Sequence, residues 1–264
     1  MHRRAVAIIV MIGLGAGSTA QAQPPAAQDL ARTKARAEQG DAEAQYRLAQ
    51  RYVTGDAVPQ DNDAALSWFR MAADQGHPGA QFMVGRAYAG GLGVPQDTAE
   101  AAAWYRKAAD QGFAEAQAGL GVLYASGDGV PEDQTAAAAL FREAAAQGHA
   151  DAQLMLGAAY VTGRGVAQDD REGAAWFRRA ADQGYPAAQF NLALMLADGR
   201  GVPQDIVESY KWLDVAASRT TGDEQAQYAR VRDVVGGRCS PSELTEALRR
   251  SREWLETFAA RERP

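Results

Sequence analysis

An internal repeat of 36 residues restricts the folds that this sequence can adopt. Glycine recurs at that interval in five places, which are Gly40, Gly76, Gly112, Gly148 and Gly184. The dipeptide Ala-Gln recurs in the same register and without an insertion, and it begins at Ala44, Ala80, Ala116, Ala152 and Ala188. A repeat of this length is typical of proteins in which one small structural unit stacks on copies of itself. The sequence therefore predicts a repeat array.

Each copy of the repeat begins with the pattern of an amphipathic helix. Four residues after each of those alanines comes a branched apolar residue: Leu48, Val84, Leu120, Leu156 and Leu192. Four residues further on come Tyr52, Tyr88, Tyr124, Tyr160 and Leu196. Residues at i, i+4 and i+8 lie on one face of an α-helix. A small residue stands beside that face in every copy, and we expect another helix to approach closely there: Ala49, Gly85, Gly121, Gly157 and Ala193.

A glycine ends this first helix, and a short turn leads to a second one. The glycines can adopt the left-handed conformation that closes a helix, and they are Gly55, Gly91, Gly127, Gly163 and Gly199. The turn contains Pro and Asp, as in residues 58–61, which favours a new helix start. Glu follows three residues after Asp97, Asp169 and Asp205, so we expect capping boxes there. The second helix carries large apolar pairs, beginning at Trp68, Trp104, Leu140, Trp176 and Trp212.

These patterns predict an all-α protein, an α-solenoid built from five helical hairpins. The predicted repeats 1 to 5 span residues 41–76, 77–112, 113–148, 149–184 and 185–220. Residues 29–40 align with a second helix but have Arg32 and Thr33 in place of the large apolar pair, so they predict an N-terminal half-repeat cap. Residues 221–264 predict C-terminal capping helices, whose Trp254 and Phe258 cover the apolar end of the array. We expect these caps because the terminal units of a stacked array must present a polar outer face to water.

The N-terminal segment predicts export. Residues 1–22 have the basic start, the apolar stretch and the Ala-x-Ala site of a secretory signal peptide, so we expect cleavage after Ala22 and a periplasmic or secreted protein. Residues 23–28 are expected to form a flexible linker. The apolar stretch of 12 residues is shorter than the roughly 20 that span a bilayer, so no stable membrane anchor is expected. Cys239 is the only cysteine, which leaves no intrachain disulfide.

The repeat resembles the Sel-1-like repeat, a relative of the tetratricopeptide repeats, from Gly40 to about Arg219. One copy carries the family pattern at Ala116, Leu120, Gly121, Tyr124, Gly127, Gly129, Val130, Pro131 and Asp133. The resemblance implies a right-handed superhelix of antiparallel helical hairpins that assembles protein complexes. A cysteine-rich branch of the family includes members linked to β-lactam binding. This chain departs from that branch because it has one cysteine, so the activity is not carried over.

Neither charge nor motifs indicate catalysis or nucleic-acid binding. The net charge is −6 and no cluster of Lys and Arg is visible, whereas phosphate binding requires one. No metalloprotease, serine-hydrolase or phosphate-loop motif occurs. His77 and His149 share one repeat position two repeats apart, and we interpret them as residues at helix starts rather than as metal ligands. The sequence predicts a protein that is not an enzyme and that holds no cofactor or metal.

The side of the first helix opposite its apolar stripe is the candidate binding surface. By resemblance to tetratricopeptide arrays, this side lines the concave face. The candidate partner-binding residues are Glu43, Tyr46, Gln50, Phe82, Arg86, Val122, Leu154, Phe190, Leu194 and Asp198. We expect the apolar ones to anchor an extended or helical peptide, with Glu43, Arg86 and Asp198 at the polar edges. Packing against a neighbouring repeat is an equal alternative for one series: Tyr46, Phe82, Ala118, Leu154 and Phe190.

The sequence therefore predicts a secreted scaffold that binds a protein or peptide through the concave face of a solenoid. Two alternatives stay open at this point. One is a periplasmic protein that hydrolyses cell-wall material or binds a β-lactam, and the other is a periplasmic regulator of a membrane receptor. A deep cleft with converging ionisable groups would favour an enzyme, whereas a long shallow groove would favour the scaffold.

Overall fold

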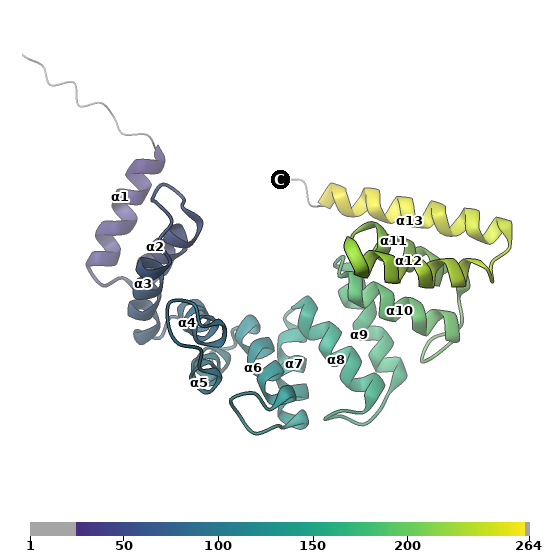
Figure 1. Ribbon diagram of the computed structural model, residues 1–264, viewed down its shortest axis with the longest axis horizontal. Coiled ribbons are helices and arrows are strands. Elements are labelled where there is room, and N and C mark those ends of the chain that lie inside the picture. The colour runs from purple at the N-terminus through teal and green to yellow at the C-terminus, as the bar shows by residue number, and fades with distance from the viewer. Residues whose placement is uncertain (1–24, 262–264) are drawn as a thin grey trace, which may run out of the picture.

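The computed structural model describes residues 25–261, so the predicted signal peptide over 1–22 lies outside the described residues. The described residues form thirteen helices and no strand. In chain order they are α1 (Pro25–Glu38), α2 (Ala42–Thr54), α3 (Asn62–Asp74), α4 (Pro78–Gly90), α5 (Thr98–Ala109), α6 (Ala114–Ser126), α7 (Gln134–Ala146), α8 (Ala150–Thr162), α9 (Asp170–Asp182), α10 (Pro186–Asp198), α11 (Ile206–Ser218), α12 (Gly222–Gly236) and α13 (Pro241–Arg261). Figure 1 shows them stacked in a curved array. The predicted all-α solenoid is confirmed.

The first helix of each repeat begins and ends as its sequence predicts. These first helices are α2, α4, α6, α8 and α10. His77 and His149 are the N-caps of α4 and α8, where the imidazole Nδ1 accepts the backbone N–H of the third helical residue at 3.2 and 3.3 Å. Each first helix ends at a glycine with a φ between 66° and 73°, which is left-handed. Glycine adopts this conformation without the steric cost that a Cβ brings.

Aspartate starts every second helix, namely α3, α5, α7, α9 and α11. Asp97 is representative, because its Oδ1 accepts the backbone N–H groups of Ala99 and Glu100, both at 3.0 Å. The three expected capping boxes are only half formed, because no bond returns from the glutamate side chain to the cap N–H among the described residues. Glu208, for example, accepts a bond from Lys211 instead. A complete capping box forms at the start of α13, between Ser240 and Glu243.

The two helices of a hairpin approach closely where the sequence places small residues. An ideal Cβ built on Gly85 would lie 2.6 Å from the ring of Tyr105, and one on Gly121 would lie 2.7 Å from Phe141. Both aromatic rings belong to the second helix of the same repeat and are buried. The ring therefore occupies the space that a side chain would take, as the small-residue column predicted.

Buried glutamines join each repeat to the one before it. Gln81 is typical: its Nε2 donates to the carbonyl of Ala73 in the preceding repeat at 3.3 Å. Its Oε1 accepts a bond of 2.8 Å from Gln111 at the end of α5. Repeats 1, 3 and 4 contain the same pair of bonds. The five-fold recurrence of Ala-Gln thus reflects a structural bond at every seam, where a seam is the contact between two consecutive repeats.

The array is closed at its N-terminal end by α1. This helix packs on α2 as a second helix packs on the next first helix, and Ala37 and Leu30 lie in one apolar cluster with Leu48. The helix starts at Pro25, so residues 25–28 are helical rather than the linker that the sequence predicted. Proline suits the first turn of a helix because its missing N–H would have no partner there.

The C-terminal end is closed by α12 and α13, which both pack on α11. Trp254 of α13 meets Trp212 edge-on at a ring-centroid distance of 5.6 Å and stacks on Phe258 at 4.7 Å. Figure 1 shows α13, in yellow, lying across this end of the array. Trp254 packs against the largest apolar cluster, which repeats 4 and 5 share.

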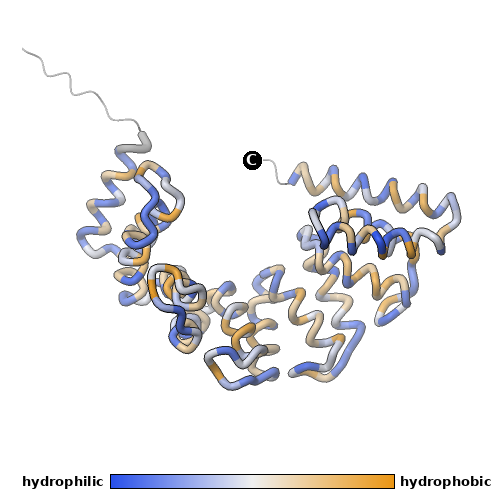
Figure 2. The backbone as a smooth tube through the Cα atoms, viewed as in Figure 1, coloured by the Kyte–Doolittle hydropathy of each residue, from blue (hydrophilic) through white to orange (hydrophobic). Residues whose placement is uncertain are grey.

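The apolar core follows the curve of the array instead of filling one centre. Figure 2 shows hydrophobic and hydrophilic positions alternating along each helix from end to end. The core consists of successive clusters, each shared by neighbouring helices. None of the helices within residues 25–261 combines the length and the hydrophobicity that crossing a membrane requires.

Candidate protein-interaction surface

One series of the predicted binding residues lies in the seams between repeats. Tyr46 stacks on His77 of the next repeat at a centroid distance of 4.4 Å, and Phe82 lies 5.6 Å from the ring of Phe113. These side chains are half-buried. The rest of the series packs similarly: Ala118 is buried, Leu154 packs on the cluster of repeats 4 and 5, and Phe190 stacks on Tyr228. Inter-repeat packing describes their contacts, and a role in binding stays a prediction.

A second set of residues, two on each first helix at equivalent repeat positions, forms a strip along the array. We name this strip the first-helix face, and its residues are Arg47, Gln50, Met83, Arg86, Gly119, Val122, Met155, Ala158, Asn191 and Leu194. Val122 is 45% exposed and Met155 is 41% exposed. The strip is polar at repeat 1, mixed at repeat 2 and mostly apolar from repeat 3 onward. Gln50, Arg86, Val122 and Leu194 are among the candidate binding residues that the sequence predicted. The two methionines are not, because the sequence analysis did not follow their repeat position.

The polar edge at repeat 1 is built around Glu43. Its carboxylate accepts bonds from His77 Nε2 at 3.0 Å and from Arg47 Nε at 2.5 Å. Because His77 Nδ1 already accepts the N–H of Ala80, the neutral imidazole donates from Nε2. These two bonds, the one from His77 first, hold the pKa of Glu43 below its ordinary value. Asp198, at the end of α10, is exposed.

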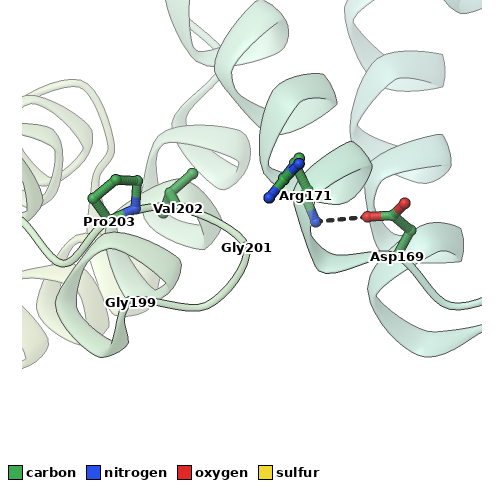
Figure 3. Close-up of a pocket in the computed structure, with 6 residues that line it drawn as sticks. All are labelled: Asp169, Arg171, Gly199, Gly201, Val202 and Pro203. Atoms are coloured by element: carbon green, nitrogen blue, oxygen red, sulfur yellow. Dashed lines mark hydrogen bonds between the residues drawn. The ribbon is translucent and has the colours of Figure 1, made fainter.

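An open recess of about 800 Å³ lies between the turns of repeats 4 and 5. Asp169, Arg171 and residues of the turn from Gly199 to Pro203 line it, as Figure 3 shows. The dashed line in Figure 3 joins the backbone nitrogen of Arg171 to the carboxylate of Asp169, at 2.9 Å. The same carboxylate oxygen accepts the N–H of Glu172 at 3.1 Å. The acidic group of this recess is thus engaged as the cap of α9.

The most deeply buried charge of the described residues belongs to Lys211 on α11, which is 8% exposed. Burial lowers the pKa of its ammonium, although the adjacent Glu208, at 2.9 Å, acts in the opposite direction. Glu208 also faces Arg250 of α13 at 3.5 Å. The cluster therefore fastens the terminal helix to the last repeat. In the described part of the chain, no group of three or more His, Cys, Asp or Glu residues is arranged to hold a metal ion.

A smaller pocket, of about 200 Å³, lies between repeats 1 and 2. Its walls include the apolar side chains of Leu66, Phe69, Met83 and Leu92, and Arg86 supplies a charged group. Sequence reasoning identified Arg86 but treated the turn that contains Leu92 as turn chemistry alone. A signal was present, because Leu92 is the one apolar residue in a column that otherwise holds Asp56, Asp128, Arg164 and Arg200.

Comparison with known proteins identifies relatives of the same architecture. The chain resembles a Sel1 repeat protein from Oxalobacter formigenes with 28% identity and a TM-score of 0.70, over 89% of this chain and 97% of that one. It also resembles a protective antigen of uropathogenic Escherichia coli strains that displays an SLR fold, with 29% identity and a TM-score of 0.61 over 89% of this chain. This chain spans 58% of the length of that antigen. The search of curated proteins gives no match.

The family assignment rests on the repeats themselves. The family model of the Sel1 repeat matches five times, over residues 42–77, 78–113, 114–149, 150–185 and 186–220. Sel1 repeat proteins generally mediate protein–protein interaction. The matches run without a gap from α2 to the end of α11 and cover more than half of the sequence. This chain therefore belongs to the Sel1 repeat family.

Proposed function

We propose that this protein is a scaffold that binds a protein or peptide partner through the first-helix face. The observation that carries the proposal is the exposure of apolar side chains on adjacent repeats, Val122 at 45% and Met155 at 41%. The opposite sides of their helices are buried in the array. Exposed apolar side chains arranged along one strip are typical of an interaction site. Because the stack is already folded into shape, the strip loses little conformational freedom when a partner binds.

We also propose that the protein acts without catalysis and outside the cytoplasm. The engaged carboxylate of Asp169, in the recess between the turns of repeats 4 and 5, supports the first part, because a general acid or base needs a free group. The signal-like sequence over residues 1–22 supports the second. The partner would then be a protein of the periplasm, of the cell surface or of the medium.

Affinity capture with matched variants tests the scaffold proposal. We expect the double variant Val122→Ser and Met155→Ser to lose proteins that the unchanged chain retains from an envelope extract. The control is Val234→Ser, on α12, which removes another exposed apolar side chain (71% exposed) away from the first-helix face. Circular dichroism verifies that all three proteins are folded. Equal capture by the unchanged chain and the double variant would refute the proposal.

A further inference from the structure

The pocket between repeats 1 and 2 has the dimensions of a site for one side chain. Leu66 and Phe69 come from α3, Met83 from α4 and Leu92 from the turn after α4. Its volume of about 200 Å³ is below the 300–1,000 Å³ that is typical of small-molecule sites. The walls are mainly apolar. A pocket of this size and lining suits a single large apolar side chain of a partner.

The turn glycines show that this seam is more open than the seams after it. An ideal Cβ on Gly129, Gly165 or Gly201 would lie 2.3, 1.9 or 2.2 Å from backbone atoms of the preceding repeat. At the equivalent Gly93, the nearest atoms are side-chain atoms of Asp63 and Leu66, both at 3.3 Å. The turn of repeat 2 therefore stands away from the backbone of α3, and the pocket lies beside it.

Polar bridges close the equivalent place at two other seams. Thr98 donates to Asp128 at 3.2 Å between repeats 2 and 3, and Arg200 pairs with Asp170 at 2.8 Å between repeats 4 and 5. At the first seam the corresponding residues are Asn62 and Leu92, and a leucine side chain forms no such bridge. Leu92 is instead 62% exposed. A large apolar side chain at the exposed lip of an apolar pocket is available to a partner.

Arg86 sets the charge that a partner needs beside its apolar group. Its guanidinium lies 5.9 Å from the ring centroid of Phe82. The side chain is exposed and forms no ion pair with any acidic residue in the described part of the chain. The other arginines of α2 and α4, Arg47 and Arg51, are both paired with carboxylates. An unpaired guanidinium binds a carboxylate through charge-assisted hydrogen bonds.

We propose that this pocket binds an acidic peptide segment of the partner, with one large apolar side chain in the pocket and an adjacent carboxylate on Arg86. The inference rests on the proposed scaffold function, since it specifies the chemistry that one end of the first-helix face recognises. It assigns specificity to a place where the repeat pattern is broken, which a uniform array cannot supply.

The test uses three capped seven-residue peptides of Gly and Ser with different centres: Leu-Glu-Glu, Ser-Glu-Glu and Leu-Lys-Lys. The full chain carries a ¹³C-methyl label on methionine, and the Met83 methyl signal is followed during each titration to about 10 mM, because one anchor is expected to bind in the millimolar range. We expect a saturable shift with Leu-Glu-Glu and affinities about tenfold lower for the other two peptides, as loss of one ion pair or one apolar group predicts.

Charge reversal provides the sharper comparison. The variant Arg86→Glu is expected to prefer Leu-Lys-Lys over Leu-Glu-Glu, whereas Arg164→Glu, an exposed arginine in the turn of repeat 4, keeps the original order. Equal shifts for all three peptides, or no shift with any of them, would overturn the inference. The capture experiment with Val122 and Met155 tests binding at repeats 3 and 4. The methyl signal of Met83 reports binding at the seam of repeats 1 and 2. Either proposal can therefore fail without the other.

Discussion

One buried glutamine in each repeat forms hydrogen bonds at the contact with the preceding repeat. In repeats 1 to 4 the side chain has both a donor and an acceptor partner. Gln189 in repeat 5 keeps the bond to Ala181 at 3.1 Å, but its Oε1 is buried without a hydrogen-bond partner among the described residues. The residue that would donate is Arg219 in this copy, and its guanidinium lies 4.2 Å from the ring centroid of Phe258 instead. In the last repeat, Arg219 therefore contacts Phe258 of α13 instead of donating a hydrogen bond to Gln189.

This difference predicts unequal costs for one substitution at two equivalent positions. Gln81→Met removes two hydrogen bonds and should lower the free energy of unfolding by about 1–3 kcal/mol. Gln189→Met removes one bond but also an unsatisfied acceptor, so its cost should stay within about 1 kcal/mol. Urea unfolding followed by circular dichroism measures both, with the exposed Gln60→Met as the control. A cost at Gln189 as large as that at Gln81 would show that the missing partner has no energetic consequence.

At the level of single elements, the turn between the two helices of a repeat determines how closely that repeat packs on the one before it. Gly165 has a φ of 71° and an ideal Cβ would lie 1.9 Å from the carbonyl oxygen of Gln134. Repeat 1 has Ala57 at this position, and it keeps a positive φ of 61°. A residue with a side chain therefore fits this turn in repeat 1, whereas in repeat 4 the backbone of the preceding repeat leaves no room for a Cβ.

Three substitutions at this turn position, in repeats 1, 2 and 4, should change the free energy of unfolding by amounts that differ in sign and in size. Gly165→Ala should cost about 3 kcal/mol, because left-handed strain adds to the backbone collision. Gly93→Ala should cost about 1 kcal/mol, since only the strain applies at the open seam. Ala57→Gly should stabilise the chain by up to about 1 kcal/mol. The midpoints of urea unfolding rank the three variants, and equal costs at Gly93 and Gly165 would contradict the account of an open first seam.

Most helices could be predicted from the sequence because each repeat contains its own helix start and helix end residues. The glycine and aspartate columns indicated helix ends and starts, and all five hairpins form where they predict. The contacts of the candidate binding residues were harder to predict, because a helical wheel separates core from surface only within one hairpin. Tyr46 and Phe82 lie opposite the core of their own helix, yet they pack against the next repeat. The pocket at Leu92 depends on how far a turn stands from its neighbour, which the periodic pattern does not contain.

At the scale of the whole molecule, the described chain is held together by neighbours. The helix pairs with substantial contact are consecutive in the chain, apart from α11 with α13. Stability of such an array is approximately the sum of the hairpin terms and the seam terms. The long first-helix face follows from the same arrangement, because no distant segment of the described chain folds back over it. Continuity of the stack is thus the central claim on which both proposals depend.

Removal of one complete repeat tests that claim most directly. A chain that lacks residues 113–148 joins repeat 2 to repeat 4 in register, and a stack held together by neighbouring repeats predicts an unchanged mean residue ellipticity at 222 nm. It also predicts cooperative unfolding at a lower urea midpoint, because one hairpin and one seam are lost. The measurement is circular dichroism of the shortened and the full chain during urea unfolding. Loss of the helical signal without denaturant would rule out a stack held together by neighbours, since it would show that the repeats depend on one shared core.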